Sequence, residues 1–183
     1  MVTTWKYMLI VVTLFIVMLT SVACGDTTSA EDHFRKGNEY AEAQDFEKAS
    51  AEFEEAVRKD PEYTSAYVNL GVAYYQLQRL DEAIEQYQQA LALEPEDAGI
   101  HSNLAAAYVQ QDELEKALDE YLRAVNLDPE LAEPHFGLGV VYREMGRAEQ
   151  AIQAFERFQE LDTGQDPFAT DYAEQFLEEL KNR

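Results

Sequence analysis

The sequence contains little cysteine and little positive charge. Cys24 is the only cysteine among 183 residues, so no disulfide can form within the chain. The 14 Lys and Arg residues are outnumbered by 36 Asp and Glu residues, which gives a net charge of −22. So acidic a surface repels phosphate backbones and anionic headgroups, which argues against nucleic-acid binding and peripheral membrane binding. The 11 tyrosines and 9 phenylalanines are too many for a disordered acidic chain, so the sequence predicts a folded domain.

Long apolar runs are also scarce, and the clearest one lies near the N-terminus. Lys6 precedes an apolar stretch from Tyr7 to about Leu19, and small residues follow as far as Ala23. A positive start, an apolar stretch and small residues before a cleavage point are the parts of a secretory signal peptide. The stretch is shorter than the roughly 20 apolar residues of a membrane-spanning helix. An uncleaved anchor helix and an ordinary signal-peptidase cut near Ala23 stay open as alternatives.

The lone cysteine ends this segment. The stretch Thr20-Ser21-Val22-Ala23-Cys24 resembles the lipobox of bacterial lipoproteins, although Ser21 stands where that family usually has Leu. In that family the thiol receives a diacylglyceryl group, the peptide is cut before the cysteine, and the new amine is acylated. The resemblance implies that residues 1–23 are a lipoprotein signal peptide and that residues 24–29 are a short tether. It further implies export, with a lipid anchor at Cys24 on the bacterial cell membrane or outer membrane.

The rest of the chain repeats itself every 34 residues. Small, aromatic and proline residues recur at fixed positions, namely Gly37, Gly71, Ala105 and Gly139; Tyr40, Tyr74, Tyr108 and Tyr142; Ala49, Ala83, Ala117 and Ala151; Phe53, Tyr87, Tyr121 and Phe155; and Pro61, Pro95 and Pro129. This pattern resembles the tetratricopeptide repeat. The resemblance implies an all-α, right-handed α-solenoid of four helix-turn-helix repeats over 30–165 (30–63, 64–97, 98–131 and 132–165), with a capping helix over 166–183.

The residues support two helices in each block without the resemblance. Apolar residues recur at three- and four-residue spacing in two stretches per block, which predicts two amphipathic helices. We expect Gly or Ala of the first helix to face Ala of the second, so that the two backbones approach closely. Asp60-Pro61, Glu94-Pro95 and Asp128-Pro129 should end the second helices, because the residue before proline avoids helical geometry.

Both ends of the array carry their own signals. Ser29 with Asp32 predicts a capped start for the first helix. His33 and Lys36 lie in a first helix that is more polar than the first helices of the other blocks, which suits a helix with solvent on its outer side. Asp166-Pro167 predicts the start of a last helix, whose apolar stripe should dock on the fourth repeat or else serve as a partner-binding face. That stripe consists of Phe168, Tyr172, Phe176, Leu177 and Leu180.

The sequence offers no catalytic or metal-binding constellation. His33, His101 and His135 occupy the same position of their blocks, so stacking should hold them about 10 Å apart, too far to share a zinc ion. We therefore expect them to be packing residues. Paired carboxylates such as Glu54-Glu55 and Glu178-Glu179 lie in helical charge runs, and no G-x-S-x-G sequence is present. The sequence predicts no enzyme activity, no cofactor and no metal.

A binding groove is the remaining candidate site. In arrays of this family the first helices line a concave surface that holds a peptide. Asn69 and Asn103 could bond a ligand's backbone or merely order their helices. The family's carboxylate clamp uses lysines in this groove, and Phe34 stands where the first of them would be. The matching positions here are Phe34, Asn38, Ala41, Val68, Asn69, Val72, Tyr75, Gln76, Ser102, Asn103, Ala106, Val109, Gln110, Phe136, Val140 and Arg143.

These features predict a membrane-anchored scaffold that binds a partner protein or peptide, similar in design to envelope lipoproteins of this family such as pilus-assembly pilotins. The expected setting is assembly of an envelope machine, and the acidic field would favour a basic partner. The alternative is a structural or self-oligomerising module, whose groove is occupied by a neighbouring copy.

Overall fold

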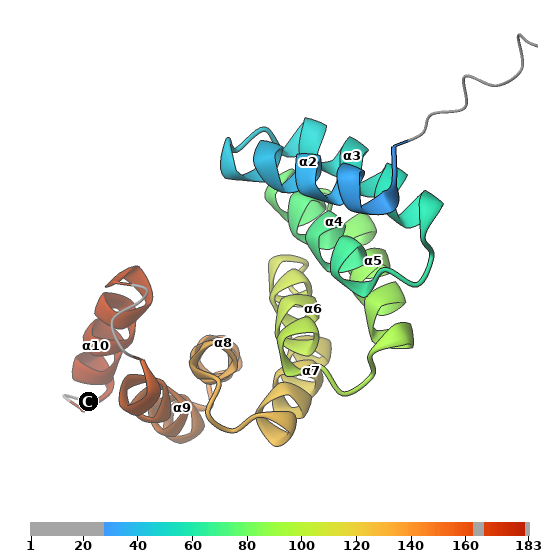
Figure 1. Cartoon of the computed structure of the whole chain (residues 1–183). Helices are drawn as coiled ribbons and strands as arrows, with labels where there is room; N and C mark the ends of the chain where they lie inside the picture. The colour runs from blue at the N-terminus through green and yellow to red at the C-terminus, as the bar shows by residue number, and fades with distance from the viewer. Residues whose placement is uncertain (1–27, 163–166, 182–183) are drawn as a thin grey trace, which may run out of the picture.

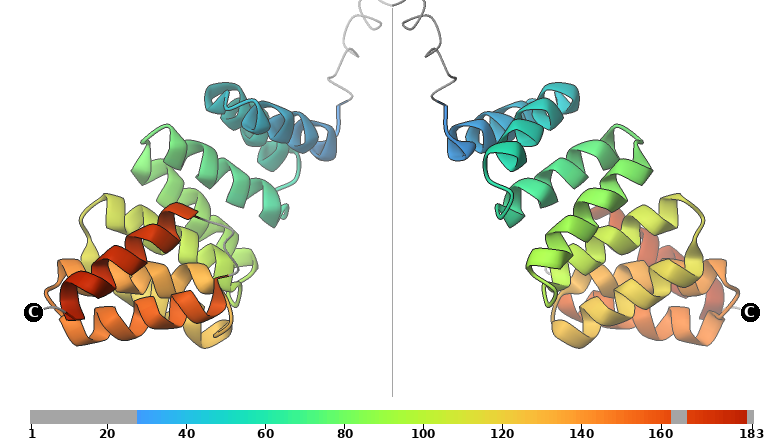
Figure 2. Two further views of the ribbon diagram at one scale, coloured as in Figure 1. Left: turned by 90° about the vertical axis from the view of Figure 1, so that its left-hand side faces the viewer. Right: turned by 90° about the vertical axis from the view of Figure 1, so that its right-hand side faces the viewer.

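The computed structural model describes residues 28–162 and 167–181, and every regular element in these two ranges is an α-helix. Figure 1 shows the helices along an arc, with α4, α6 and α8 on its inner side and α5, α7 and α9 on its outer side. Figure 2 shows the N-terminal helix pair at one end of the stack and the last helices at the other. The helices are α2 (Ala30–Glu42), α3 (Phe46–Lys59), α4 (Thr64–Gln76), α5 (Leu80–Leu93), α6 (Ala98–Gln110), α7 (Leu114–Leu127), α8 (Ala132–Glu144), α9 (Ala148–Leu161) and α10 (Pro167–Lys181).

The helix boundaries follow the proline signals. The first helices of the pairs begin at residues 30, 64, 98 and 132, which are 34 residues apart. Asp60, Glu94 and Asp128 are the C-caps of α3, α5 and α7, and each has left the helical conformation before its proline. The all-α solenoid predicted from the sequence is confirmed.

The second helix of each pair has a buried alanine at the same position of the repeat. Ala49, Ala83, Ala117 and Ala151 are completely buried. The glycines have a different role from the one expected, because they face aromatic rings and not alanines. A Cβ atom on Gly71 would lie 2.5 Å from the Tyr87 ring, and one on Gly37 would lie 2.4 Å from the Phe53 ring. Glycine therefore leaves room for the large ring of the second helix.

The three histidines are buried packing residues. His33, His101 and His135 are 7%, 5% and 8% exposed, as expected for packing residues. The Nδ1 atoms of His33 and His101 lie 2.6 Å from carboxylate oxygens of Glu52 and Glu120, on the second helix of the same pair. His33 is buried because that helix and Thr28, whose hydroxyl lies 2.8 Å from Nε2, cover it. In the described part of the chain, no group of three or more His, Cys, Asp or Glu residues could hold a metal ion.

The N-terminal end of the array carries the predicted cap. The Ser29 hydroxyl accepts from the Asp32 backbone N–H, and the Asp32 carboxylate accepts from the Ser29 backbone N–H, which forms a capping box. Residues 1–23, together with Cys24, lie outside the described residues. None of the described helices is long and apolar enough to cross a membrane.

At the other end, α10 packs on α9 and α8. Ala173 is completely buried and Leu177 is 5% exposed, in one cluster with Phe155 and Phe158 of α9. The docking predicted for the last helix is therefore present, but its stripe is shorter than expected. Phe168 is 87% exposed, because it lies in the first turn, before the part of α10 that reaches α9.

Candidate functional site

The two middle helices of the inner side, α4 and α6, differ from α2, which contains Asp, Glu, Lys and Arg. Helices α4 and α6 contain no Asp, Glu, Lys or Arg, although the whole chain carries a net charge of −22. Carboxylates are present on α2, on the outer helices α3, α5 and α7, and in the connections. We call the surface formed by the inward positions of α2, α4, α6 and α8 the inner face.

One hollow of the inner face lies between α2, α3 and α4. This α2–α4 cavity has a volume of about 140 Å³. Its lining is mostly apolar, with one amide, and consists of Ala41, Phe46, Phe53, Asn69, Val72 and Ala73. The predicted groove residues Ala41, Asn69 and Val72 therefore meet at one place.

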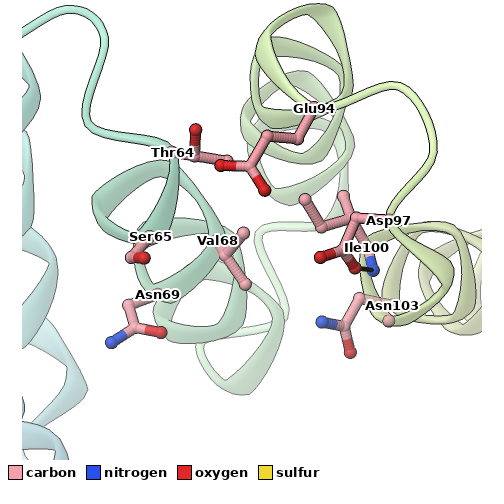
Figure 3. A pocket seen from close by; sticks show the side chains of 9 residues that line it. Thr64, Ser65, Val68, Asn69, Glu94, Asp97, Ile100 and Asn103 are labelled. Carbon is pink, nitrogen blue, oxygen red and sulfur yellow. Dashed lines mark hydrogen bonds between the residues drawn. The ribbon is translucent and has the colours of Figure 1, made fainter.

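A larger hollow lies between the N-terminal ends of α4 and α6. This α4–α6 cavity has a volume of about 270 Å³. Figure 3 shows Val68 pointing across the gap toward Ile100 and Asn103, while Glu94 reaches in from the end of α5 toward Thr64. The lining residues are Thr64, Ser65, Val68, Asn69, Glu94, Asp97, Gly99, Ile100 and Asn103.

Asparagine side chains connect the inner face. The Asn69 amide donates a 2.8 Å hydrogen bond to the Asn38 carbonyl oxygen, which ties α4 to α2. Asn69 also lines both cavities. Asn103 is half-buried at the α4–α6 cavity, where its amide faces the space. Asn69 therefore orders neighbouring helices, whereas Asn103 is placed to meet a ligand.

The predicted groove residues near the C-terminus are covered. The Phe136 ring lies 5.7 Å from the Tyr172 ring of α10, and the Arg143 guanidinium lies 5.4 Å from the same ring. Val140 belongs to the same apolar cluster. Helix α10 thus occupies the inner face at the fourth pair, and the open part of the face belongs to the first three pairs.

Ser102 is not part of the inner surface. Its side chain is completely buried, and its hydroxyl has no hydrogen-bond partner. The prediction that Ser102 lines the groove is wrong, because the helices around this small side chain close over it.

The other predicted groove residues differ in exposure. Phe34 is half-buried, with its ring 4.8 Å from that of Tyr63. Tyr75, Ala106 and Val109 are half-buried, and Gln76 and Gln110 are exposed, on the C-terminal halves of α4 and α6.

Sequence reasoning missed the residues that complete the larger cavity. Thr64, Ser65, Glu94, Asp97, Gly99 and Ile100 line it but were not predicted. Glu94 and Asp97 lie in the connection between α5 and α6, not on a first helix. The 34-residue register contained a usable signal, because Val68 and Asp97 stand where the first block has the rings of Phe34 and Tyr63.

Comparison of the sequence with known families identifies the repeats. Residues 37–78, 73–112 and 107–146 match the family described as TPR repeat, and residues 132–164 match tetratricopeptide repeat. The chain belongs to the tetratricopeptide repeat family. No protein of curated function matches the sequence.

Solved structures of TPR proteins resemble the whole array. A MamA fragment from Desulfovibrio magneticus is 25% identical, with a TM-score of 0.70 over 77% of this chain and 80% of that chain. Another MamA structure is 23% identical, with a TM-score of 0.69 over 84% and 86% of the two chains. The first TPR domain of Spaghetti (RPAP3), solved with an HSP90 peptide bound, is 24% identical, with a TM-score of 0.63 over 66% and 96%.

Proposed function

We propose that this TPR protein is an exported, membrane-anchored scaffold that binds a partner protein through its inner face during assembly of an envelope machine. The observation that carries the proposal is the open, uncharged surface of α4 and α6, with two cavities, inside a strongly acidic molecule. The amides, hydroxyls and apolar side chains of these two helices suit the backbone and side chains of a bound peptide.

The RPAP3 array supports peptide binding as a use of this fold, since that structure contains a bound HSP90 peptide. The ligand proposed here differs in charge, because α4 and α6 offer no Lys or Arg to an acidic peptide. A neutral or basic segment fits the inner face better. The acidic body would also attract a basic partner and accelerate its encounter.

The partner can be sought by capture from detergent-solubilised envelope with the purified full-length chain as bait. Tyr75→Ala and Asn103→Ala remove inner-face contacts, and Gln89→Ala is the matched truncation on the exposed surface of α5. We expect the first two variants to lose most of the captured partner and the third to retain it. Equal capture by all three would contradict binding through the inner face. Concentration-dependent mass in light scattering, with no captured partner, would favour the self-oligomerising alternative.

The anchor has a separate test. We propose that Cys24 is lipidated, because its position after an apolar signal segment resembles a lipobox. Two or three acyl chains hold a protein on a bilayer, where one chain would be marginal. Palmitate should label the wild type, which should pellet with membranes, while Cys24→Ala should accumulate as uncut precursor. Unlabelled, full-length wild type on the membrane would show an anchor helix instead.

A further inference from the structure

The α4–α6 cavity exists because two rings are missing from this interface. Between α2 and α4, the rings of Phe34 and Tyr63 lie 4.8 Å apart and fill the corresponding space. The Tyr63 hydroxyl also donates a 2.7 Å hydrogen bond to Glu31. At the equivalent positions, 34 residues later, the chain has Val68 and Asp97. These smaller side chains leave about 270 Å³ open between α4 and α6.

The lining of this cavity combines an apolar floor with two carboxylates. Val68 and Ile100 provide the apolar surface, and Ile100 is only 3% exposed. Asp97 caps α6, where its Oδ1 accepts from the Ile100 backbone N–H at 2.9 Å, so the carboxylate is held at the cavity. Glu94 is exposed and reaches in from the opposite wall (Figure 3). None of the lining residues is a Lys or Arg that would neutralise these two groups.

We propose that the α4–α6 cavity receives one lysine or arginine side chain of the partner protein, an inference that rests on the proposed function. The methylene groups of such a side chain would lie over Val68 and Ile100, while its charged end meets Glu94 and Asp97. The Asn103 carbonyl oxygen adds an acceptor. Aromatic rings of the chain itself fill the corresponding space between α2 and α4. Between α4 and α6, a side chain of the partner would complete the packing.

Small cationic probes test this inference without knowledge of the partner. The probes are Nα-acetyl-arginine N-methylamide, its lysine counterpart and its citrulline counterpart, which has the shape of arginine but no charge. Each is titrated into the isotope-labelled full-length protein in detergent micelles and followed by NMR. We expect saturable shifts of the Gly99 backbone amide and the Asn103 side-chain amide with a cationic probe and not with citrulline. Equal shifts with citrulline, or shifts only at other sites, would overturn the inference.

Isosteric variants separate local recognition from net charge. Glu94→Gln removes one carboxylate, and Asp97→Asn removes the other while keeping a residue that caps helices equally well. Each should weaken probe binding about two- to fivefold. Glu96→Gln is the control, because Glu96 is an exposed neighbour that does not line the cavity. If Glu96→Gln weakens binding as much as Glu94→Gln does, the probe responds to the overall field and the inference fails.

Binding of the captured partner to these variants distinguishes failure of the cationic-subsite inference from failure of the proposed function. If Tyr75→Ala retains the partner, binding through the inner face is wrong. If Tyr75→Ala loses the partner while Glu94→Gln and Asp97→Asn bind partner and probe like wild type, only the cationic subsite is wrong. Loss of the partner in Tyr75→Ala, with weaker partner and probe binding in Glu94→Gln and Asp97→Asn, supports both.

Discussion

At the scale of single residues, the buried alanines set the distance between paired helices. Ala83 and Ala117 are completely buried. Leucine at either position would force extra carbon atoms between packed helices, so Ala83→Leu should lower the free energy of unfolding by roughly 1–3 kcal/mol. Urea unfolding measures this change. Glu85→Gln, on the exposed side of the same helix, should stay within about 0.5 kcal/mol of wild type. Equal losses in both variants would contradict the role of the alanine.

Gly137 of α8 lies against the Tyr121 ring of α7, across the boundary between the third and fourth helix pairs. A Cβ atom there would lie 2.1 Å from Cζ of Tyr121, inside any permitted contact. Gly137→Ala should therefore destabilise the protein by about 1–3 kcal/mol, although alanine favours helices by about 1 kcal/mol. Gly99→Ala is the control, since its Cβ would approach only the movable Asp97 carboxylate, at 3.2 Å. A Gly137→Ala variant as stable as wild type would show that the Tyr121 ring moves aside without cost.

Sequence reasoning succeeded for residues whose environment repeats and failed where neighbouring pairs differ. The buried alanines follow from the register alone, because each pair contains the same contact. Ser102 was wrongly assigned to the groove surface. Whether a side chain at a groove position is exposed depends on the neighbouring helix pair, and Ser102 is completely buried. The partners that cover His33, Glu52 and Thr28, were also not predicted, because the position of His33 at the end of the array does not reveal them.

At the scale of helices, α10 is the described helix that packs least extensively against its neighbours. It contacts only the last pair, and Leu177 is one of its two most buried side chains. In an array stabilised by contacts between neighbours, damage at one end should stay local. Leu177→Ala should therefore cost about 2–5 kcal/mol in the stability of α10, seen as faster hydrogen exchange in α10 and α9, with little change in α4 and α5.

Phe168→Ala is the matched control for that truncation, because this ring is 87% exposed. It should leave the exchange rates of α9 unchanged. Uniformly faster exchange along the whole chain in Leu177→Ala would show that the array unfolds as one unit.

The helices themselves were largely predictable, and the spaces between them were not. Proline after each second helix and the apolar spacing are local signals, so the boundaries follow from short stretches. The α4–α6 cavity depends on two side chains that are 29 positions apart, Val68 and Asp97, and on Glu94 in a connection. A prediction that places all binding residues on the first helices of the pairs therefore finds only part of the lining of this cavity.

At the scale of the whole molecule, the distribution of charge matters more than its total. The exposed ion pairs, such as Arg58 with Glu55 and Lys116 with Glu113, join neighbours on one helix or connection and should contribute little to stability. The remaining acidic groups lie on other helices and in the connections, so α4 and α6 carry no charged side chain. This arrangement leaves the surfaces of α4 and α6 to contacts that do not depend on charge, apart from the two carboxylates of the α4–α6 cavity.

Several tyrosines give the whole molecule a defined response to alkaline pH. Burial and the hydrogen bond to Glu31 raise the pKa of Tyr63 to about 12, and burial raises the pKa of Tyr74, Tyr87 and Tyr121 as well. An unfolded tyrosine has a pKa of about 10, so the folded protein holds these protons more tightly. Their stabilising contribution is complete below pH 10 and is lost as the pH rises through the folded pKa values.

We therefore expect the free energy of unfolding, measured with urea at constant ionic strength, to fall between pH 10 and pH 12. Tyr63→Phe keeps the ring against Phe34 but removes one titrating group, so its curve should fall less steeply than that of wild type. The new tyrosinate charges would also repel an already acidic body, and added salt should reduce that part of the loss. Identical pH curves for wild type and Tyr63→Phe would show that the Tyr63 hydroxyl loses its proton as easily in the folded chain as in the unfolded one.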